Sequence, residues 1–381
     1  MELASLTREL VSIPSHVDET AAGDAIEDWL DAETDASVER DPAGNVLARR
    51  GSPGGPSLAM VGHHDVVPPD DSQVVGDTYD VFERDGRLHG RGTADMKGAL
   101  AAMLLAFRDA DLSPGGSRER PAELVFASFV GEEVGGEGAR HAIDRGFAPD
   151  VAVVGEGSTN YSQPGVTDVV VAHKGRRAST ITATGVASHA SEPESGENAI
   201  YRASEAVDVV QKMPVSRVAV AEEELCGSVV VTEIEGGSAW NVVPERCSFT
   251  VDERTVPGER APLERLESID GVEWTVEQDL PPMACSDDGF AETALEAVRA
   301  VHERRGAPHP AHTTKPHATD AGWLADRAGT ACVIVGPAEP GEAHTAEESV
   351  SVAVLERCRE CYDEIAARWV QSVGEGSSTD E

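Results

Sequence analysis

One pattern recurs along the chain: a short apolar run ends abruptly in polar residues, and a segment with helical spacing follows. The runs stand in "SLAMVGHH" from Ser57, "ELVFASFVGEE" from Glu123, "VAVVGEG" from Val151 and "ACVIVGP" from Ala331. Short apolar runs that alternate with helices are typical of strands buried on both faces of a sheet. The pattern therefore predicts an α/β fold with a mostly parallel sheet, in which polar residues at the carboxyl ends of the strands lie where ligands bind.

The middle of the chain has a different character. Strands with polar and apolar residues in alternation are expected in "GRRASTITAT", "GSVVVTEIEGG", "ERCSFTVDERTV" and "VEWTVEQDL", with helices over "NAIYRASEAVDVVQKM" and near 262–269. This predicts a small α+β domain inserted into the larger one. The first pattern then returns, with a helix at 288–304 and a terminal helix at 347–370. A chain of 381 residues exceeds the size of a single core, so we expect two domains: 1–174 with 287–381, and 175–286.

The chain is strongly acidic, with 69 acidic and 31 basic residues, a net charge of −38 and only four lysines. Such a surface repels nucleic acid and anionic membranes, so neither is expected as a partner. It also repels itself, and salt near 1 M removes most of that cost because it shortens the Debye length to roughly 3 Å. The composition therefore predicts a protein from a salt-loving organism. No apolar run is long enough to span a membrane, and the N-terminus lacks signal-peptide features, so we expect a cytoplasmic location.

Metal-type ligands recur at five of the predicted strand ends. They are "GHHDVVP" (His63, His64, Asp65), "GRGTADMKG" (Asp95), "GEEVGG" (Glu132, Glu133), "VVGEG" (Glu156) and "GPAEPGEAH" (His344). Each alone has a structural explanation, such as a turn residue, a helix cap or a surface loop. Their recurrence indicates instead a site that holds two metal ions about 3.5–4 Å apart with a shared carboxylate between them.

Together these motifs resemble the dinuclear-zinc M20 peptidase and deacylase family, and the resemblance covers nearly the whole chain. It implies a zinc-hydrolase catalytic domain with an inserted lid and dimerisation domain. It also implies two divalent ions, zinc with cobalt or manganese as alternatives. His63 and Glu156 would bind the first ion, Glu133 and His344 the second, and Asp95 would bridge them.

The resemblance assigns further roles around these ligands. Asp65 would orient His63 through the second imidazole nitrogen, as ligating histidines require. His64 would face away and bind no metal. Glu132 would be the general base in the attack of a metal-bound water and would then pass the proton to the leaving amine. The Asp95–Met96 peptide bond is expected to be cis, as at the matching position of the family.

The inserted domain carries its own matches. His189, in "GVASHASEPESGENAI", resembles a histidine that reaches a neighbouring subunit's active site and stabilises the tetrahedral oxyanion. The structural alternative is a histidine that caps a loop of the lid. Asn241 and Arg254, in "SAWNVVPERCSFTVDER", resemble the pair that engages the substrate carboxylate, a role that suits the bidentate guanidinium. The resemblance thus implies a homodimer formed through the inserted domain.

The reaction implied is removal of an acyl group from an N-acyl amino acid, as in acetylornithine deacetylase. Succinyl-diaminopimelate desuccinylase, and a dipeptidase or carboxypeptidase acting on a short peptide, remain alternatives. A metal-bound binding protein without catalysis is a fourth. "GPAEPGEAHTAEESV" resembles the acetylornithine deacetylase version of the last-ligand loop, "GRRAS" resembles the desuccinylase, and "HATDAGWLA" departs from both. The acyl group and side chain of the substrate stay open at this level.

Overall fold

A computed structural model describes residues 3–113, 122–220 and 223–376 of the chain. The chain divides into two compact units. The first contains the described residues up to Ala172, the segment Ala284–Lys315 and the residues from Thr319 onward. The second contains His173–Met283 with Pro316–Ala318, and most of its residues are those of the predicted insertion at 175–286.

The first unit is built on a sheet in which nine strands of the described chain take part. In order they are β1 (Ser37–Arg40), β2 (Val46–Gly51), β8 (Glu123–Phe129), β3 (Ser57–His63), β9 (Val151–Val154), β21 (Ala331–Ile334), β10 (Val169–His173) and β19 (Met283–Ala284), with β20 (His312–Lys315) also paired to β10. The central strands β8, β3, β9 and β21 are parallel, as predicted. The strands outside them pair antiparallel. Every residue of β3 and β8 is buried, which explains why their sequences are uninterrupted apolar runs.

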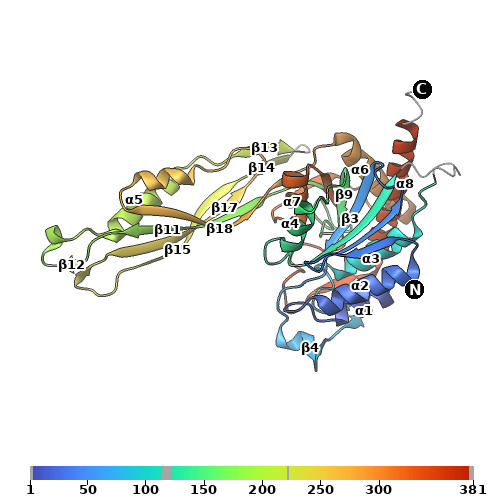
Figure 1. The fold of residues 1–381 in the computed structure, drawn as a ribbon, viewed down its shortest axis with the longest axis horizontal. Helices are drawn as coiled ribbons and strands as arrows, with labels where there is room; N and C mark the ends of the chain where they lie inside the picture. Colours follow the sequence, from blue (N-terminus) through green and yellow to red (C-terminus); the bar gives the residue numbers. More distant parts are fainter. Residues whose placement is uncertain (1–2, 114–121, 221–222, 377–381) are drawn as a thin grey trace. The chain divides into compact units, whose positions relative to one another are not determined.

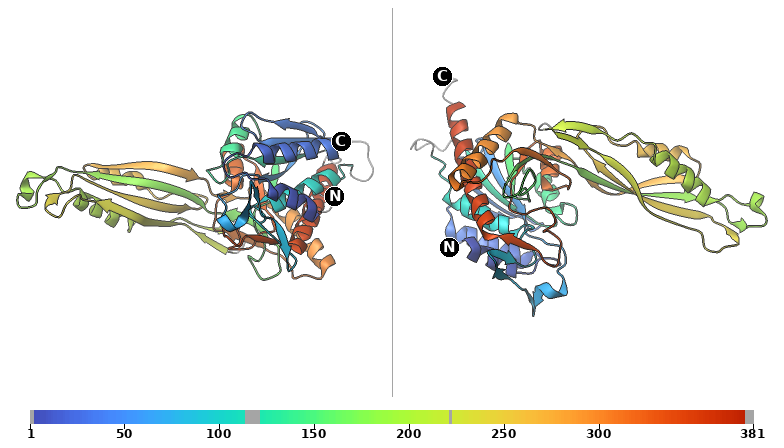
Figure 2. Two further views of the ribbon diagram at one scale, coloured as in Figure 1. Left: turned by 90° about the horizontal axis from the view of Figure 1, so that it is seen from below. Right: turned by 180° about the vertical axis from the view of Figure 1, so that it is seen from behind.

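Seven α-helices of the described residues belong to the first unit. They are α1 (Leu3–Ser12), α2 (Thr20–Glu33), α3 (Lys97–Asp109), α4 (Glu137–Asp144), α6 (Asp288–Arg305), α7 (Asp320–Trp323) and α8 (Val352–Gly376). Helix α3 packs on β3 and β8, α7 packs on β9 and β21, and α6 and α8 pack against each other (Figure 2). Over the described ranges, none of the helices combines the length and the apolar character needed to cross a lipid bilayer.

The predicted terminal helix at 347–370 is wrong at its start. Residues Ser349–Ser351 form the strand β22, which pairs antiparallel with β7 (Arg87–His89), and the helix begins only at Val352. Alternating serine and valine have low helix propensity, and the strand pairing satisfies their backbone groups. A third strand, β6 (Phe82–Arg84), completes this small sheet, and β4 (Val74–Val75) pairs with β5 (Thr78–Tyr79) beside it in the sequence.

The second unit is an antiparallel sheet covered by a helix. Its strands lie in the order β15 (Ser228–Gly236), β17 (Arg246–Thr255), β11 (Gly175–Thr184) and β18 (Val272–Leu280), and two short pairs accompany them: β12 (Ser188–His189) with β16 (Val242–Val243), and β13 (Arg217–Val220) with β14 (Glu223–Cys226). Helix α5 (Ala199–Val210) packs along β11, β15 and β17 (Figure 1). The α+β character was predicted, but the expected helix near 262–269 is a 3₁₀ segment, Leu263–Ser268.

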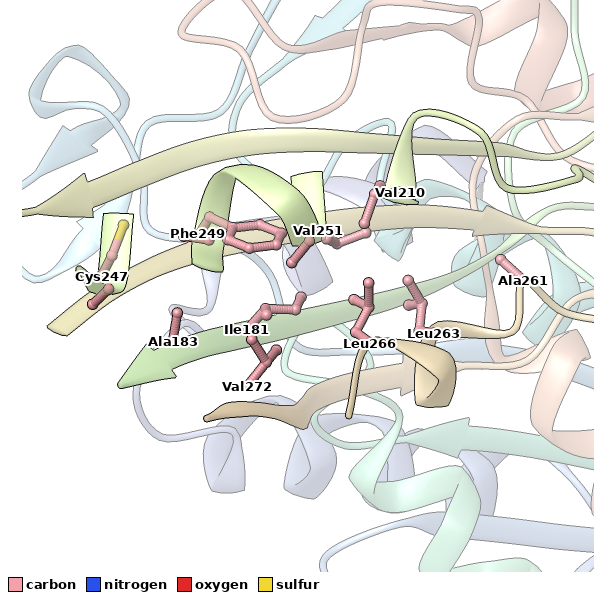
Figure 3. Close-up of a cluster of buried hydrophobic side chains, with 13 residues drawn as sticks. Ile181, Ala183, Val210, Cys247, Phe249, Val251, Ala261, Leu263, Leu266 and Val272 are labelled. Atoms are coloured by element: carbon pink, nitrogen blue, oxygen red, sulfur yellow. The ribbon is translucent and has the colours of Figure 1, made fainter. Parts of the chain in front are cut away.

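One face of this sheet carries the core of the second unit. Along β11 buried and half-buried residues alternate, so every second side chain points to the same side. Figure 3 shows Ile181, Phe249 and Val251 on that side, with Leu263 and Leu266 of the 3₁₀ segment beside them. Apolar side chains form this cluster, whereas polar side chains gather at the strand ends of the large sheet.

Candidate metal centre

The candidate ligands come from loops at one end of the large sheet, with one exception. His63 is the last residue of β3, Glu133 follows β8, Glu156 follows β9, and His344 lies in the long loop after β21. Asp95 does not follow a strand of the large sheet, so the prediction of five such strand ends is wrong at this position. It lies instead in the loop between β7 of the small sheet and α3.

The structure brings the five predicted ligands together as two triplets that share Asp95. His63, Asp95 and Glu156 form one, and Asp95, Glu133 and His344 the other, and within each triplet the ligand atoms lie within 4.8 Å of one another. Asp95 Oδ1 lies 3.2 Å from His63 Nε2, and Asp95 Oδ2 lies 3.1 Å from His344 Nε2. Each carboxylate oxygen of Asp95 therefore faces one triplet, which is the arrangement that a bridging ligand requires. The Asp95–Met96 peptide bond is cis, as predicted.

The remaining ligand atoms close both triplets. His63 Nε2 lies 3.4 Å from Glu156 Oε1, and His344 Nε2 lies 3.0 Å from Glu133 Oε1. His63 is buried, whereas the side chain of His344 is 51% exposed. Two imidazole nitrogens and three carboxylates are a donor set that suits zinc, and also cobalt or manganese.

Electrostatics shows how much negative charge is gathered here. Burial raises the pKa of Glu133, and it raises the pKa of Glu132 well above the usual range, where neighbouring carboxylates add to the effect. Hydrogen bonds to Asp95 and Glu133 raise the pKa of His344 to about 10. Burial alone would raise the pKa of Asp95, but the hydrogen bonds from His344 and His63 lower it below its usual range. The residues therefore fit divalent cations, which would compensate the excess of buried carboxylates.

Asp65 fixes the orientation of several of these groups. Its Oδ1 lies 3.2 Å from His63 Nδ1, which leaves Nε2 of that imidazole directed at the triplet. The same carboxylate accepts the backbone N–H groups of Glu132 at 3.1 Å and of Glu133 at 3.0 Å. One buried acid thus holds a candidate ligand histidine and the loop with the two adjacent glutamates.

His64 lies outside both triplets, as the sequence predicted. Its Nδ1 lies 2.8 Å from Ser128 Oγ, and burial lowers the pKa of the imidazole to about 3. His64 is therefore neutral near neutral pH, and its side chain is fully buried.

Comparison with known proteins agrees with this geometry. The sequence model of peptidase family M20/M25/M40 matches residues 59–368. Acetylornithine deacetylase from Myxococcus xanthus is 32% identical over 343 residues, which cover 85% of this chain and 83% of that protein. The chain belongs to peptidase family M20/M25/M40.

Solved structures share the M20 fold. Aminopeptidase PepT from Bacillus cereus superposes with a TM-score of 0.76 at 20% identity, covering 96% of this chain and 97% of that one. A dinuclear metal binding peptidase of the M20 family from Bacillus subtilis gives a TM-score of 0.71 at 17% identity, covering 97% of this chain and 98% of that one. The chain is accordingly an M20 hydrolase with a mixed α/β fold around a large sheet.

The predicted residues of the inserted domain fall into two places within the second unit. His189 pairs with Val242, and the N–H of Ala190 donates to the carbonyl oxygen of Asn241 at 2.9 Å, so His189 and Asn241 lie together. Asn241 precedes the start of β17 at Arg246, whereas Arg254 lies near the end of that strand. Eight residues separate Arg246 from Arg254, which corresponds to roughly 27 Å along a strand. Within one second unit, Asn241 and Arg254 are therefore too far apart to contact the same carboxylate.

Three further polar residues at the centre were not predicted. Lys315, at the end of β20, donates to Glu156 Oε2 at 2.9 Å and leaves the other oxygen of Glu156 to the first triplet. Asp320 is buried, and within the described chain neither of its carboxylate oxygens has a hydrogen-bond partner. Burial raises the pKa of Asp320 to about 7. Glu348 is buried beside the Asp95 loop. Lys315 was visible in the sequence as one of only four lysines, and Asp320 lay in the segment "HATDAGWLA" that departs from the family patterns, whereas Glu348 was one acid among 69.

Proposed function

We propose that this M20 protein removes the acyl group from an N-acyl amino acid, as an acetylornithine deacetylase does, with two divalent metal ions at the candidate centre. The deacetylase of Myxococcus xanthus supports the reaction, because its similarity extends over most of both chains. The two triplets that share Asp95 support the dinuclear site. His63 and Glu156 would hold one ion, Glu133 and His344 the other, and Asp95 both.

Bound cations would polarise the scissile carbonyl and supply a water of lowered pKa. The protein's own part in the proton transfers falls to Glu132. Its carboxylate belongs to neither triplet, although its neighbour Glu133 does, and Asp65 holds the backbone of both. Glu132 is therefore free to take the proton of the attacking water. Glu132 would then give this proton to the leaving nitrogen as the amide C–N bond breaks.

The free carboxylate of Glu132 beside a ligand carboxylate is the observation that carries the catalytic proposal. A binding protein needs the ligands alone, whereas a hydrolase also needs a base that the metal does not occupy. The test is a panel of substrates: N-acetylornithine, N-succinyl-diaminopimelate and dipeptides, assayed with zinc or cobalt in molar salt. We expect release of acetate from N-acetylornithine to be fastest, with no turnover after the metal is removed.

The other outcomes of the panel separate the alternatives. Faster release of succinate would assign the desuccinylase reaction, and faster cleavage of dipeptides would assign a peptidase. An absence of turnover on every substrate, in protein with full metal content, would favour the binding protein.

A homodimer through the second unit is part of the proposal. Because Asn241 and Arg254 are separated within one chain, they can meet at one substrate only if they come from two copies. The outer strand β15 pairs with β17 alone among the described strands and exposes Val230 and Ile234, which are 51% and 58% exposed. An unpaired, partly apolar edge of this kind is suited to a second chain.

Mixing two inactive variants tests the dimer and the role of His189. Glu132→Gln and His189→Ala chains are refolded together; if His189 acts in the partner's site, a heterodimer contains one site with both groups intact. Partial recovery of activity would support donation of His189 to the partner's site. An absence of recovery in proven heterodimers would mean that His189 acts in its own subunit or only caps the loop. A cytoplasmic location completes the proposal, and it is supported by the six cysteines, all of which are free.

A further inference from the structure

Glu348 is a buried acid, 1% exposed, that directly precedes β22 and lies four residues after His344. Its Oε1 accepts three backbone hydrogen bonds from the loop before α3. The donors are the backbone N–H groups of Gly92 at 2.9 Å, Ala94 at 3.0 Å and Asp95 at 3.2 Å. One carboxylate oxygen therefore gathers the backbone of the whole turn that carries the shared ligand.

This contact acts on the most constrained position of the centre. The two oxygens of Asp95 lie 3.2 Å from His63 Nε2 and 3.1 Å from His344 Nε2, so a small displacement of its backbone would disturb both triplets. Within the described chain, Glu348 is the side chain that accepts the N–H of Asp95. A shift of this turn would misplace the shared carboxylate without removing it.

Glu348 also joins the Asp95 turn to the loop of His344. Its own backbone carbonyl oxygen accepts the N–H of Gly90 at 3.1 Å, and the pairing of β22 with β7 begins at the next residue. His344 has a left-handed backbone conformation, with φ of 63°, which a histidine keeps only where its surroundings impose it. The two loops that supply the second triplet's shared and terminal ligands thus meet at Glu348.

The charge of Glu348 is already compensated within the chain. Its Oε2 accepts a hydrogen bond from Arg91 Nη1 at 2.5 Å, and that guanidinium is buried as well. A balanced pair adds little net negative charge at the metal centre. The reach and acceptor geometry of the side chain are therefore the properties that the Asp95 turn uses.

We propose that Glu348 is a positioning residue that sets the placement of Asp95 relative to His344, and thereby the affinity of the second metal ion. The inference rests on the proposed function, in which both triplets hold metal. Asp65 makes a comparable set of contacts elsewhere in the centre, where its carboxylate contacts His63 and accepts the N–H groups of Glu132 and Glu133. Groups that orient metal ligands typically change metal affinity by roughly 10–100-fold when they are altered.

Two conservative variants separate reach from charge. Glu348→Asp keeps the charge but is one methylene too short to reach the turn, and Glu348→Gln keeps the length and an acceptor oxygen but loses the charge. Metal-free protein is titrated with Mn²⁺, with binding followed by calorimetry and the coupling between the two ions by electron paramagnetic resonance. We expect Glu348→Asp to lower the binding affinity for the second ion by about 10–100-fold and to reduce the magnetic coupling between the two ions. Glu348→Gln should stay closer to the wild type in both readouts.

Glu253→Asp is the matched control. Glu253 is a buried acid of the second unit whose Oε2 accepts Arg177 Nε at 2.6 Å and whose Oε1 accepts the N–H of Ala261 at 2.7 Å. Shortening it should lower stability and leave both metal affinities unchanged. Wild-type affinity and coupling in Glu348→Asp, or weaker binding in Glu348→Gln than in Glu348→Asp, would overturn the inference. Binding of fewer than two ions by the wild type would instead contradict the proposed function, and the inference with it.

Discussion

Buried charge is balanced differently in the second unit and at the candidate metal centre of the first unit. In the second unit, the carboxylate of Glu253 is matched by the guanidinium of Arg177, which also lies over the ring of Trp274 with its Cζ 5.2 Å from the ring centroid. In the first unit, four carboxylates gather around two imidazoles and one ammonium group: Asp95, Glu132, Glu133 and Glu156 with His63, His344 and Lys315.

This difference distinguishes buried charges that stabilise the fold from buried charges that can bind a cation. A buried ion pair balanced within the chain can be removed only at a cost in stability, because the remaining partner is left uncompensated. A cluster with more carboxylates than cationic side chains leaves room for cations from solution. Substituting a buried acid should therefore have different consequences in the two places.

The largest effect is expected at the free carboxylate of the first unit. Glu132→Gln keeps the shape of the side chain but cannot accept a proton from water, so kcat should fall by roughly 10²–10⁴-fold. Metal content, measured on the same sample, should equal that of the wild type. A fall in metal content in proportion to the rate would make Glu132 a ligand instead of the base.

Breaking the balanced pair of the second unit should affect stability alone. Glu253→Ala leaves Arg177 buried without its partner, which should lower the free energy of unfolding by roughly 3–5 kcal/mol. Denaturant unfolding measures the loss, and metal analysis of the folded variant should show no change. A loss of bound metal in this variant would mean that the two units do not bury charge independently.

The parts of the fold and of the candidate site that could be predicted are those that leave a local pattern in the sequence. The central strands were predicted because burial on both faces forces uninterrupted apolar runs, and His63, Glu133 and Glu156 follow from their ends. The small sheet of β6, β7 and β22 was not predicted, because β6 and β7 have three residues each and leave no periodic pattern. Asp95 was therefore placed on the wrong kind of loop, although its position in both triplets was predicted.

The supporting residues were out of reach for a different reason. Lys315 meets Glu156 across 159 positions, and Glu348 meets Asp95 across 253. In a chain with 69 acids, neither pairing nor burial of one more glutamate can be read from its neighbours in sequence. The strand β22 depends on the same long-range pairing, which explains why 349–351 was expected to be helical.

A smaller effect concerns a buried imidazole next to the centre. His64 is neutral in the folded protein because burial lowers its pKa to about 3, whereas the unfolded chain takes up a proton below about 6.5. The unfolded state therefore binds more protons between these values, so this contribution to stability is complete above pH 6.5 and is lost as the pH falls toward 3. His64→Gln should reduce the loss of unfolding free energy on acidification by up to about 1.4 kcal/mol per pH unit. Identical slopes for variant and wild type in chemical unfolding from pH 7 to 4.5 would contradict it.

The smallest effect per residue is expected from the exposed acids of both units. Salt screens exposed charges far more than buried ones, so raising KCl toward molar levels should stabilise both units through the net charge of −38. The midpoint of thermal unfolding should rise by at least a few degrees. A midpoint that stays flat or falls between low and high salt would contradict the prediction that the acidic composition is an adaptation to high salt.

The central claim is that the surplus carboxylates of the first unit are balanced by two metal ions that share Asp95. The most direct test is metal stoichiometry by elemental mass spectrometry, after metal-free protein is reloaded with zinc and freed of excess by gel filtration. We predict two ions per chain for the wild type and fewer than one for Asp95→Ala, because that substitution removes a ligand from both triplets. One ion or none in the wild type, or two ions retained by Asp95→Ala, would contradict the account.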